Sequence, residues 1–314
     1  MPQRPDALKH LAPNWFASVM GLAGLSLAWG RAEPILGEMA GAGALVLAAA
    51  AALLFVALAV LSWIRWQHYP EALAADLKHP VRHAFIATIP VSIILLATCG
   101  VSLLGTSAWL AALWWLGSLL QLFTTLWVAT RWLSADKAQS LSWAALTPVL
   151  LIPVVGNVLA PLAGVSLGAG AWAAAQFGIG LLLWPVLLAL ILARIAAQGL
   201  WAERLLPATF ISIAPPAVIG SAALQLGGPP LLAWMCWGVA LFFLLWSLQI
   251  GRRLLAQQHS AAQAPAMIAL ALASLVIVLL GIATWKSWRE GSLLQAEPVA
   301  LIAVAGSDQP PRPQ

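Results

Sequence analysis

The sequence holds few side chains that could do chemistry, and they are not spaced for catalysis. Three histidines, His68, His79 and His83, are the closest approach to a metal site, together with Glu71 and Asp76. Their spacing matches no zinc motif, and no P-loop, zinc-protease or nucleophile-elbow motif and no CxxC pair occurs elsewhere. We therefore expect no catalytic residues, no metal and no cofactor, and an enzyme is the least favoured class.

The acidic residues can all be assigned to loops or tails. A proton-coupled transporter usually needs ionisable groups at membrane depth, and cation channels use rings of carboxylates. Neither is expected here, so a neutral interior with basic residues at one mouth favours anions over cations. The acidic residues are Asp6, Glu33, Glu38, Glu71, Asp76, Asp136, Glu203, Glu290, Glu297 and Asp308.

Long stretches of the chain carry no Asp, Glu, Lys or Arg, and their lengths suit a membrane. A spanning helix needs about 20 apolar residues. Counting one or two spans in each stretch, and one in 13–30, gives nine spans, so we predict an all-α polytopic membrane protein built from helical hairpins. The composition agrees, with 62% hydrophobic and 8% charged residues, where soluble domains carry about 25% charged residues. The charge-free stretches are 39–64, 83–130, 138–193, 205–251 and 254–285.

Basic residues predict the orientation of these spans. With a cytoplasmic N-terminus, eleven Lys and Arg lie in inner segments and only Arg31 lies in an outer loop, as the positive-inside trend requires. We place Lys78, Arg82 and Arg204 at the cytoplasmic mouth. The net charge of +5 lacks a dense basic patch with aromatics, so no nucleic-acid partner is expected. The inner set is Arg4, Lys9, Arg65, Lys78, Arg82, Arg131, Lys137, Arg194, Arg204, Arg252 and Arg253.

Prolines alternate between the members of the predicted hairpins. Turn residues at 105–107, 161–170 and 227–230 pair the spans, and the first member of each of these pairs carries internal proline. The second members mostly lack it, and Pro185 is the exception. Proline interrupts a membrane helix and frees a carbonyl that protein or cavity water must satisfy. The pattern favours kinked inner helices around a central pore, sheathed by straighter partners. The alternative is that proline is simply frequent in membrane helices.

Four stretches in this order resemble the tellurite-resistance/dicarboxylate transporter family, the bacterial TehA-like relatives of plant slow-type anion channels. They are 15–29 (WFASVMGLAGLSLAW), 79–90 (HPVRHAFIATIP), 152–161 (IPVVGNVLAP) and 210–218 (FISIAPPAV), and the similarity covers roughly residues 10–290. The resemblance implies an anion channel of the bacterial inner membrane, usually a homotrimer, that passes small anions or C4-dicarboxylates. The resemblance also implies that the matching positions line or shape the pore: Phe16, Gly21, Gly24, Phe85, Pro90, Pro153, Asn157, Phe210, Pro215 and Pro216. For each phenylalanine, ordinary packing between helices is the alternative.

The chain departs from the family in its number of spans. The family has ten, and its ninth carries the phenylalanine regarded as the plug, whereas only 266–285 follows the eighth span here and resembles the tenth. We therefore predict a membrane domain over 13–290, between a cytoplasmic tail at 1–12 and a disordered tail at 291–314. The pore is then open on one flank, completed by another subunit, or nonfunctional. The competing hypothesis to transport is a non-conducting membrane scaffold.

Overall fold

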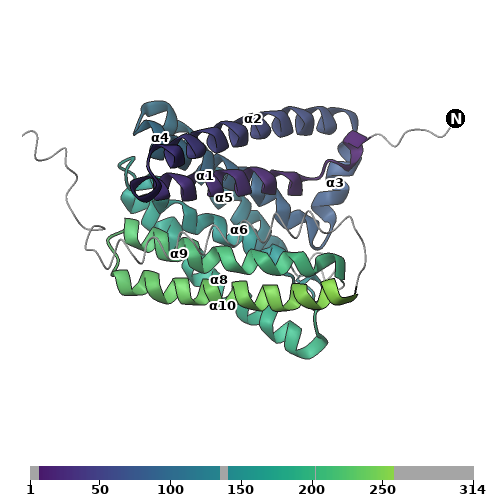
Figure 1. The fold of residues 1–314 in the computed structure, drawn as a ribbon. Coiled ribbons are helices and arrows are strands. Elements are labelled where there is room, and N and C mark those ends of the chain that lie inside the picture. Colours follow the sequence, from purple (N-terminus) through teal and green to yellow (C-terminus); the bar gives the residue numbers. More distant parts are fainter. Residues whose placement is uncertain (1–6, 135–140, 202, 258–314) are drawn as a thin grey trace, which may run out of the picture. The chain divides into compact units, whose positions relative to one another are not determined.

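The computed structural model describes residues 7–134, 141–201 and 203–257. Within these ranges every regular element is an α-helix or a 3-10 helix, and no strand is present (Figure 1). The prediction of an all-α polytopic membrane protein is therefore confirmed. Six helical stretches in the described residues are long and apolar enough to cross a membrane, and Pro148–Gly164 is a shorter apolar one.

Four long helices are continuous. They run from one end of the fold to the other with 25 to 31 residues each, which at 1.5 Å per residue gives at least about 38 Å. Many of their large apolar side chains are exposed, as lipid contact requires. These outer helices are α2 (Glu38–His68), α5 (Ala108–Trp132), α8 (Gly170–Gln198) and α10 (Pro230–Gln257).

The alternate elements are broken, and each combines 3-10 and α-helix. We call them the inner segments. The first is η2 (Pro13–Trp15) with α1 (Phe16–Leu36), and the second is η3 (Arg82–Ala87) with α4 (Thr88–Leu104). The third is η5 (Pro148–Leu150), α6 (Leu151–Val155), η6 (Gly156–Leu159) and α7 (Pro161–Gly164), and the fourth is η7 (Glu203–Ile213) with α9 (Ala214–Gln225).

The predicted interruption at proline occurs as a change of helix type. Pro90, Pro153 and Pro216 are each the third residue of their α-helix. The first four N–H groups of an α-helix have no partner within it, so proline, which has no N–H, costs little there. The chain before each of these three helices is 3-10, and Pro13 lies in the 3-10 turn before α1, whereas Pro185 lies inside the long helix α8 without breaking it. The opening segment thus follows the same plan as the others.

Each inner segment forms a hairpin with the long helix that follows it. The turns pass through Gly37, Gly105, Gly168 and Gly227, which all have φ between 74° and 80°, a conformation that glycine adopts without strain. Three of these turns lie in regions predicted from sequence. Short elements complete the described fold: η1 (Ala7–His10), α3 (Pro70–Lys78) and η4 (Trp143–Ala145).

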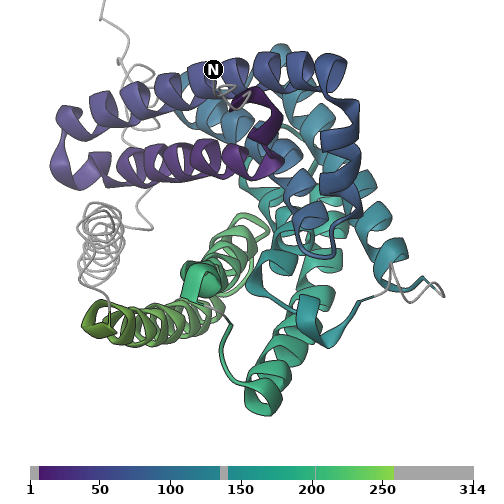
Figure 2. The same ribbon diagram turned by 90° about the vertical axis from the view of Figure 1, so that its right-hand side faces the viewer.

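The inner segments contact one another in chain order. α1 packs on α4, α4 on η6 and α7, and these on α9, while the long helices lie outside them (Figure 2). Burial agrees with this arrangement of inner and outer elements, because 67% of the inner span in 82–104 is buried but only 17% of the outer span in α2. Within the described residues, no contact of comparable extent joins α9 back to α1.

Eight of the nine predicted spans correspond to described helices, and the ninth, 266–285, lies outside the described residues, as does the tail 291–314. α1 is not one of the six stretches long and apolar enough to span, because Arg31 and Glu33 belong to its last turns. One sequence expectation is wrong. Glu33, Glu38, Glu71 and Asp76 were assigned to loops but lie in α-helices, and Asp76 is buried. Glu203, also assigned to a loop, begins the 3-10 helix η7.

Candidate functional site

The three candidate pore residues of α1, Phe16, Gly21 and Gly24, differ in their surroundings. Phe16 is buried, and its ring lies 5.5 Å from that of Phe55 on α2 in an edge-to-face arrangement. Gly21 and Gly24 are exposed, and a Cβ added at either would meet no heavy atom within 4 Å. The phenylalanine therefore joins the inner helix to its outer partner, while the glycines border open space.

Hydroxyl groups of α4 tie it to the start of α1. Thr88 Oγ1 can donate to the carbonyl of Pro13 at 2.8 Å or to that of Phe85 at 2.6 Å, and Ser92 Oγ lies 3.2 Å from the carbonyl of Phe16. Pro90 is buried between them, whereas the Phe85 side chain is partly exposed. The carbonyls of Pro13 and Phe16, at the start of the first inner segment, thus find donors on the second, which fixes the two segments relative to each other.

The break at Pro153 is held by a buried polar network. The carbonyl of Pro153 accepts hydrogen bonds from Gln121 Nε2 and Thr125 Oγ1 of α5, both at 2.7 Å, and from Asn157 Nδ2 at 3.2 Å. Asn157 Nδ2 also lies 2.8 Å from Thr125 Oγ1, and its Oδ1 accepts from Gln176 Nε2 of α8 at 3.2 Å. All of these side chains are buried. The network gives the Pro153 carbonyl three side-chain donors and joins the third inner segment to both neighbouring long helices.

Sequence reasoning missed the partners in this network. Ser118, Gln121 and Thr125 recur at intervals of three and four residues in a charge-free stretch, which places them on one helical face. Ser118 Oγ donates to Gln176 Oε1 at 2.6 Å and accepts from Trp172 Nε1 at 2.8 Å. The polar periodicity was the available signal, but only the tertiary structure identifies what it faces.

The fourth inner segment positions Phe210, Pro215 and Pro216. Phe210 lies in η7 and is partly exposed, like Phe85 in η3, and both prolines are buried at the start of α9. The exposed side of α9 carries the small residues Ala217 and Ser221. η3 and η7 therefore each present a partly exposed phenylalanine in the 3-10 half of an inner segment.

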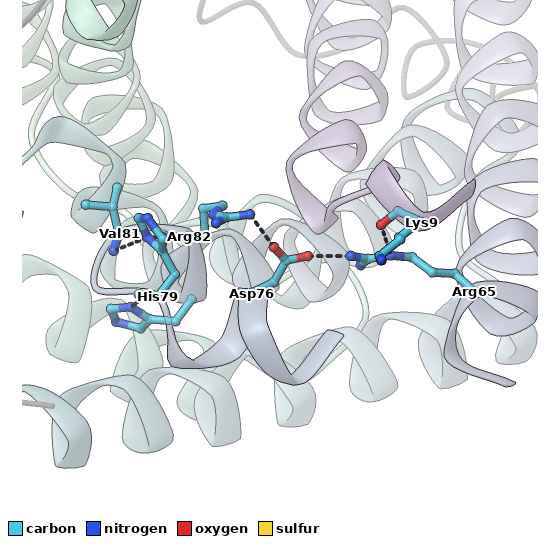
Figure 3. Close-up of polar contacts among 7 residues, drawn as sticks. Lys9, Arg65, Asp76, His79, Val81 and Arg82 are labelled. Carbon is cyan, nitrogen blue, oxygen red and sulfur yellow. Dashed lines mark hydrogen bonds and ion pairs between the residues drawn. The ribbon is translucent and has the colours of Figure 1, made fainter. Parts of the chain in front are cut away.

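At the basic end, Asp76 lies between two arginines (Figure 3). Its Oδ2 accepts from Arg65 Nη2 at 2.7 Å, and its Oδ1 accepts from Arg82 Nη1 at 2.8 Å. The Arg65 and Asp76 side chains are only 5% and 4% exposed, whereas that of Arg82 is 51% exposed. Arg65 Nε also donates to the carbonyl of Lys9 at 3.1 Å. The cluster joins the N-terminal segment, α2, α3 and the start of η3.

Of the three cations predicted at this mouth, the structure describes two side chains. Arg82 and Lys78 are exposed and flank the end of α3. The side chain of Arg204 lies outside the described part of the molecule. The ion pair holds Arg82 near the buried carboxylate while much of its guanidinium faces solvent.

The histidines make structural hydrogen bonds. His79 Nδ1 accepts from the backbone N–H groups of Val81 and Arg82, both at 3.1 Å (Figure 3). Burial, and then the charge of Arg82, lowers the pKa of His79, although Asp76 opposes the shift. His83 Nε2 lies 3.1 Å from Trp132 Nε1, and its Nδ1 lies 2.9 Å from the carbonyl of His79. The described residues contain no group of three metal-ligating side chains.

The hairpins, the broken inner segments and the charge-free stretches that form them define a polytopic integral membrane protein. Residues 10–285 match the family model described as voltage-dependent anion channel (SLAC1). The chain belongs to this family, which confirms the resemblance seen in the sequence.

Individual relatives agree with the family. Two uncharacterized transporters of Methanocaldococcus jannaschii are 30% identical over 67% of the chain and 27% identical over 66% of it. The aligned regions span 62% and 63% of those proteins. The tellurite resistance protein TehA homolog of Haemophilus influenzae is 30% identical over 75% of the chain and 71% of its own length.

Proposed function

We propose that this protein conducts small anions passively across a membrane, along a pathway lined by the inner segments. The observation that carries the proposal is the open space beside Gly21 and Gly24 on an inner helix that also packs, through Phe16, against an outer one. Neutral, small residues leave room for a hydrated solute and offer no carboxylate to bind a cation. Membership of the anion channel family supports the choice of solute.

Individual residues take distinct roles in this pathway. Phe85 and Phe210, both partly exposed in 3-10 segments, narrow it. Pro90, Pro153 and Pro216 set the points where the inner segments change from 3-10 to α, and Pro215 precedes the last of these points. Asn157 holds the third break in place.

The mouth attracts anions through its positive charge. Lys78 and Arg82 are exposed, and Arg204 is the third cation that the sequence places at this mouth. Such a charge raises the local anion concentration and the rate of entry, more strongly at low ionic strength. We place this mouth and the N-terminus on the cytoplasmic side. With that orientation, eleven of the twelve Lys and Arg residues that we assigned to inner or outer segments lie on the inner side.

The permeants that fit a neutral pathway are inorganic monovalent anions or C4-dicarboxylates, and the working assembly is a homotrimer in a bacterial inner membrane. Purified protein in liposomes with chloride, nitrate or malate gradients tests the conduction. Flux of at least one anion should exceed that of empty vesicles, and the absence of any excess would refute the proposal.

Matched phenylalanine variants test the pathway itself. Phe85→Ala and Phe210→Ala should raise the flux by widening narrow points. Phe242→Ala, on an exposed face of the long helix α10, should leave it unchanged.

The scaffold hypothesis has one observation in its favour. Within the described residues, the inner segments do not close between α9 and α1. A folded protein whose vesicles conduct no anion, in all three variants and in the parent chain, would support a scaffold instead.

A further inference from the structure

A pocket of about 450 Å³ lies on one face of α5 near its C-terminal end. Its residues recur every three or four positions, so they form one stripe along the helix. From Phe123 to Arg131 the stripe is about 12 Å long at 1.5 Å per residue. It therefore runs from the charge-free part of the span to the basic boundary. The pocket is lined by Phe123, Leu126, Trp127, Thr130, Arg131 and Ser134.

The inner part of the pocket is apolar and faces away from the protein. Phe123 is 67% exposed and Leu126 is 59% exposed, which in a membrane means contact with hydrocarbon chains. Trp127 is better held, because its ring packs edge-on against His83 at 6.2 Å between centroids. This part offers an acyl chain a groove with one fixed aromatic wall.

The other end of the pocket carries a fixed positive charge. Arg131 Nη1 donates to the carbonyl of Leu77 at 2.7 Å, and Nη2 donates to that of Lys78 at 2.6 Å. These acceptors carry no formal charge, and Arg131 forms no ion pair in the described part of the chain. Its Nε is buried without a hydrogen-bond partner there. The charge of Arg131 is thus held at the boundary without a described counter-charge, next to the exposed Lys78.

We propose that this pocket binds an anionic phospholipid. One acyl chain lies along Phe123, Leu126 and Trp127, and the phosphate lies at the rim beside Thr130, in the field of Arg131 and Lys78. The geometry suits a lipid because an apolar groove at membrane depth ends in positive charge at the boundary, where phosphate headgroups lie. A zwitterionic lipid fills the same groove but gains nothing from the charge.

Native mass spectrometry of the full chain in detergent tests this, with phosphatidylglycerol and phosphatidylcholine of identical chains as probes. Arg131 alone, as one cation near the surface, is expected to give about a fivefold preference for phosphatidylglycerol, and Lys78 adds to it. Leu126→Trp fills the groove and should abolish that preference. Leu119→Trp is the control, because Leu119 is a similarly exposed leucine, at 51%, on the same helix but outside the pocket.

A second variant leaves the groove and Arg131 intact. Thr130→Asp places a negative charge at the rim and should remove the preference for phosphatidylglycerol without changing phosphatidylcholine binding. Equal binding of the two lipids to the parent chain, or equal effects of Leu119→Trp and Leu126→Trp, would overturn the proposal. A changed oligomer mass in Leu126→Trp with unchanged lipid counts would overturn it too, because the face would then contact another copy of the chain.

Discussion

Replacing Asp76 by asparagine tests whether the buried ion pair holds the basic end together. The change keeps the size of the side chain but removes the charge that faces Arg65 at 2.7 Å. Removing one partner of a buried pair costs about 3–5 kcal/mol, because the other charge stays buried without compensation. The contact with Arg82 adds at most about 1 kcal/mol, since that side chain is 51% exposed and solvent screens the pair.

The cost should appear as a lower unfolding temperature. At roughly 2–4 °C per kcal/mol for a domain of about this size, Asp76→Asn should lower Tm by about 6–20 °C. Arg82→Gln should lower it by less than about 4 °C on the same scale. Tryptophan fluorescence during heating of the full chain in detergent measures both, at one fixed scan rate because membrane proteins often unfold irreversibly.

A control and a rescue make the reasoning refutable. Glu71 is an exposed acidic residue on the same helix, α3, so Glu71→Gln should change Tm little. Replacing both Arg65 and Asp76 with apolar residues of similar size should recover much of the loss, because no buried charge then remains. Equal losses for Glu71→Gln and Asp76→Asn, or a double variant no more stable than Asp76→Asn, would show that the pair does not act as described.

Three further predictions concern the inner segments and the basic end. Asn157→Ala should cost about 1–3 kcal/mol, seen as a lower Tm, because it leaves buried partners of the polar network unpaired; an unchanged Tm would contradict the network's role. Gly24→Leu should keep the fold but reduce anion flux, because open space adjoins Gly24. Gly180→Ala should instead reduce the yield of folded protein, since its Cβ would lie 2.5 Å from the side chain of Val158. A loss of folded protein in Gly24→Leu and none in Gly180→Ala would refute both assignments. Burial, followed by the charge of Arg82, lowers the pKa of His79, so the stability that depends on its neutral ring is complete above pH 6.5 and is lost as the pH falls below that value. In His79→Gln, Tm should therefore change less with pH below about 6.5 than in the parent chain. An identical dependence of Tm on pH in the two proteins would count against this role of His79.

Much of the fold could be predicted from local rules. The lengths of the charge-free stretches predicted the spans, glycine-rich turns predicted the hairpins, and alternating prolines predicted which helices are broken. These features are local, because the membrane requires each span to satisfy its own backbone and to be apolar along its length. The change from 3-10 to α-helix at each break could not be predicted in the same way. Pro90 and Pro153 are each the third residue of an α-helix, and where that helix starts depends on where the preceding 3-10 helix ends.

The candidate site was predictable in residue type but not in geometry. Gly21 and Phe16 share one sequence motif, yet one borders open space and the other packs on Phe55. The hydrogen bonds that hold the Pro153 break come from side chains 28 and 32 residues away. No local pattern specifies which distant helix lies opposite a given face.

By itself, the sequence determined that this chain is a membrane protein of helical hairpins, where its spans turn, and on which end its positive charge gathers, because hydropathy and charge act residue by residue. Only the tertiary structure decided that Asp76 is a buried partner of Arg65 rather than a loop residue, and that Arg131 is fixed by the carbonyls of Leu77 and Lys78. The physical reason is that burial and pairing are properties of neighbours brought together by packing, and the sequence spacing of 11 to 54 residues between these partners carries no signal of that contact.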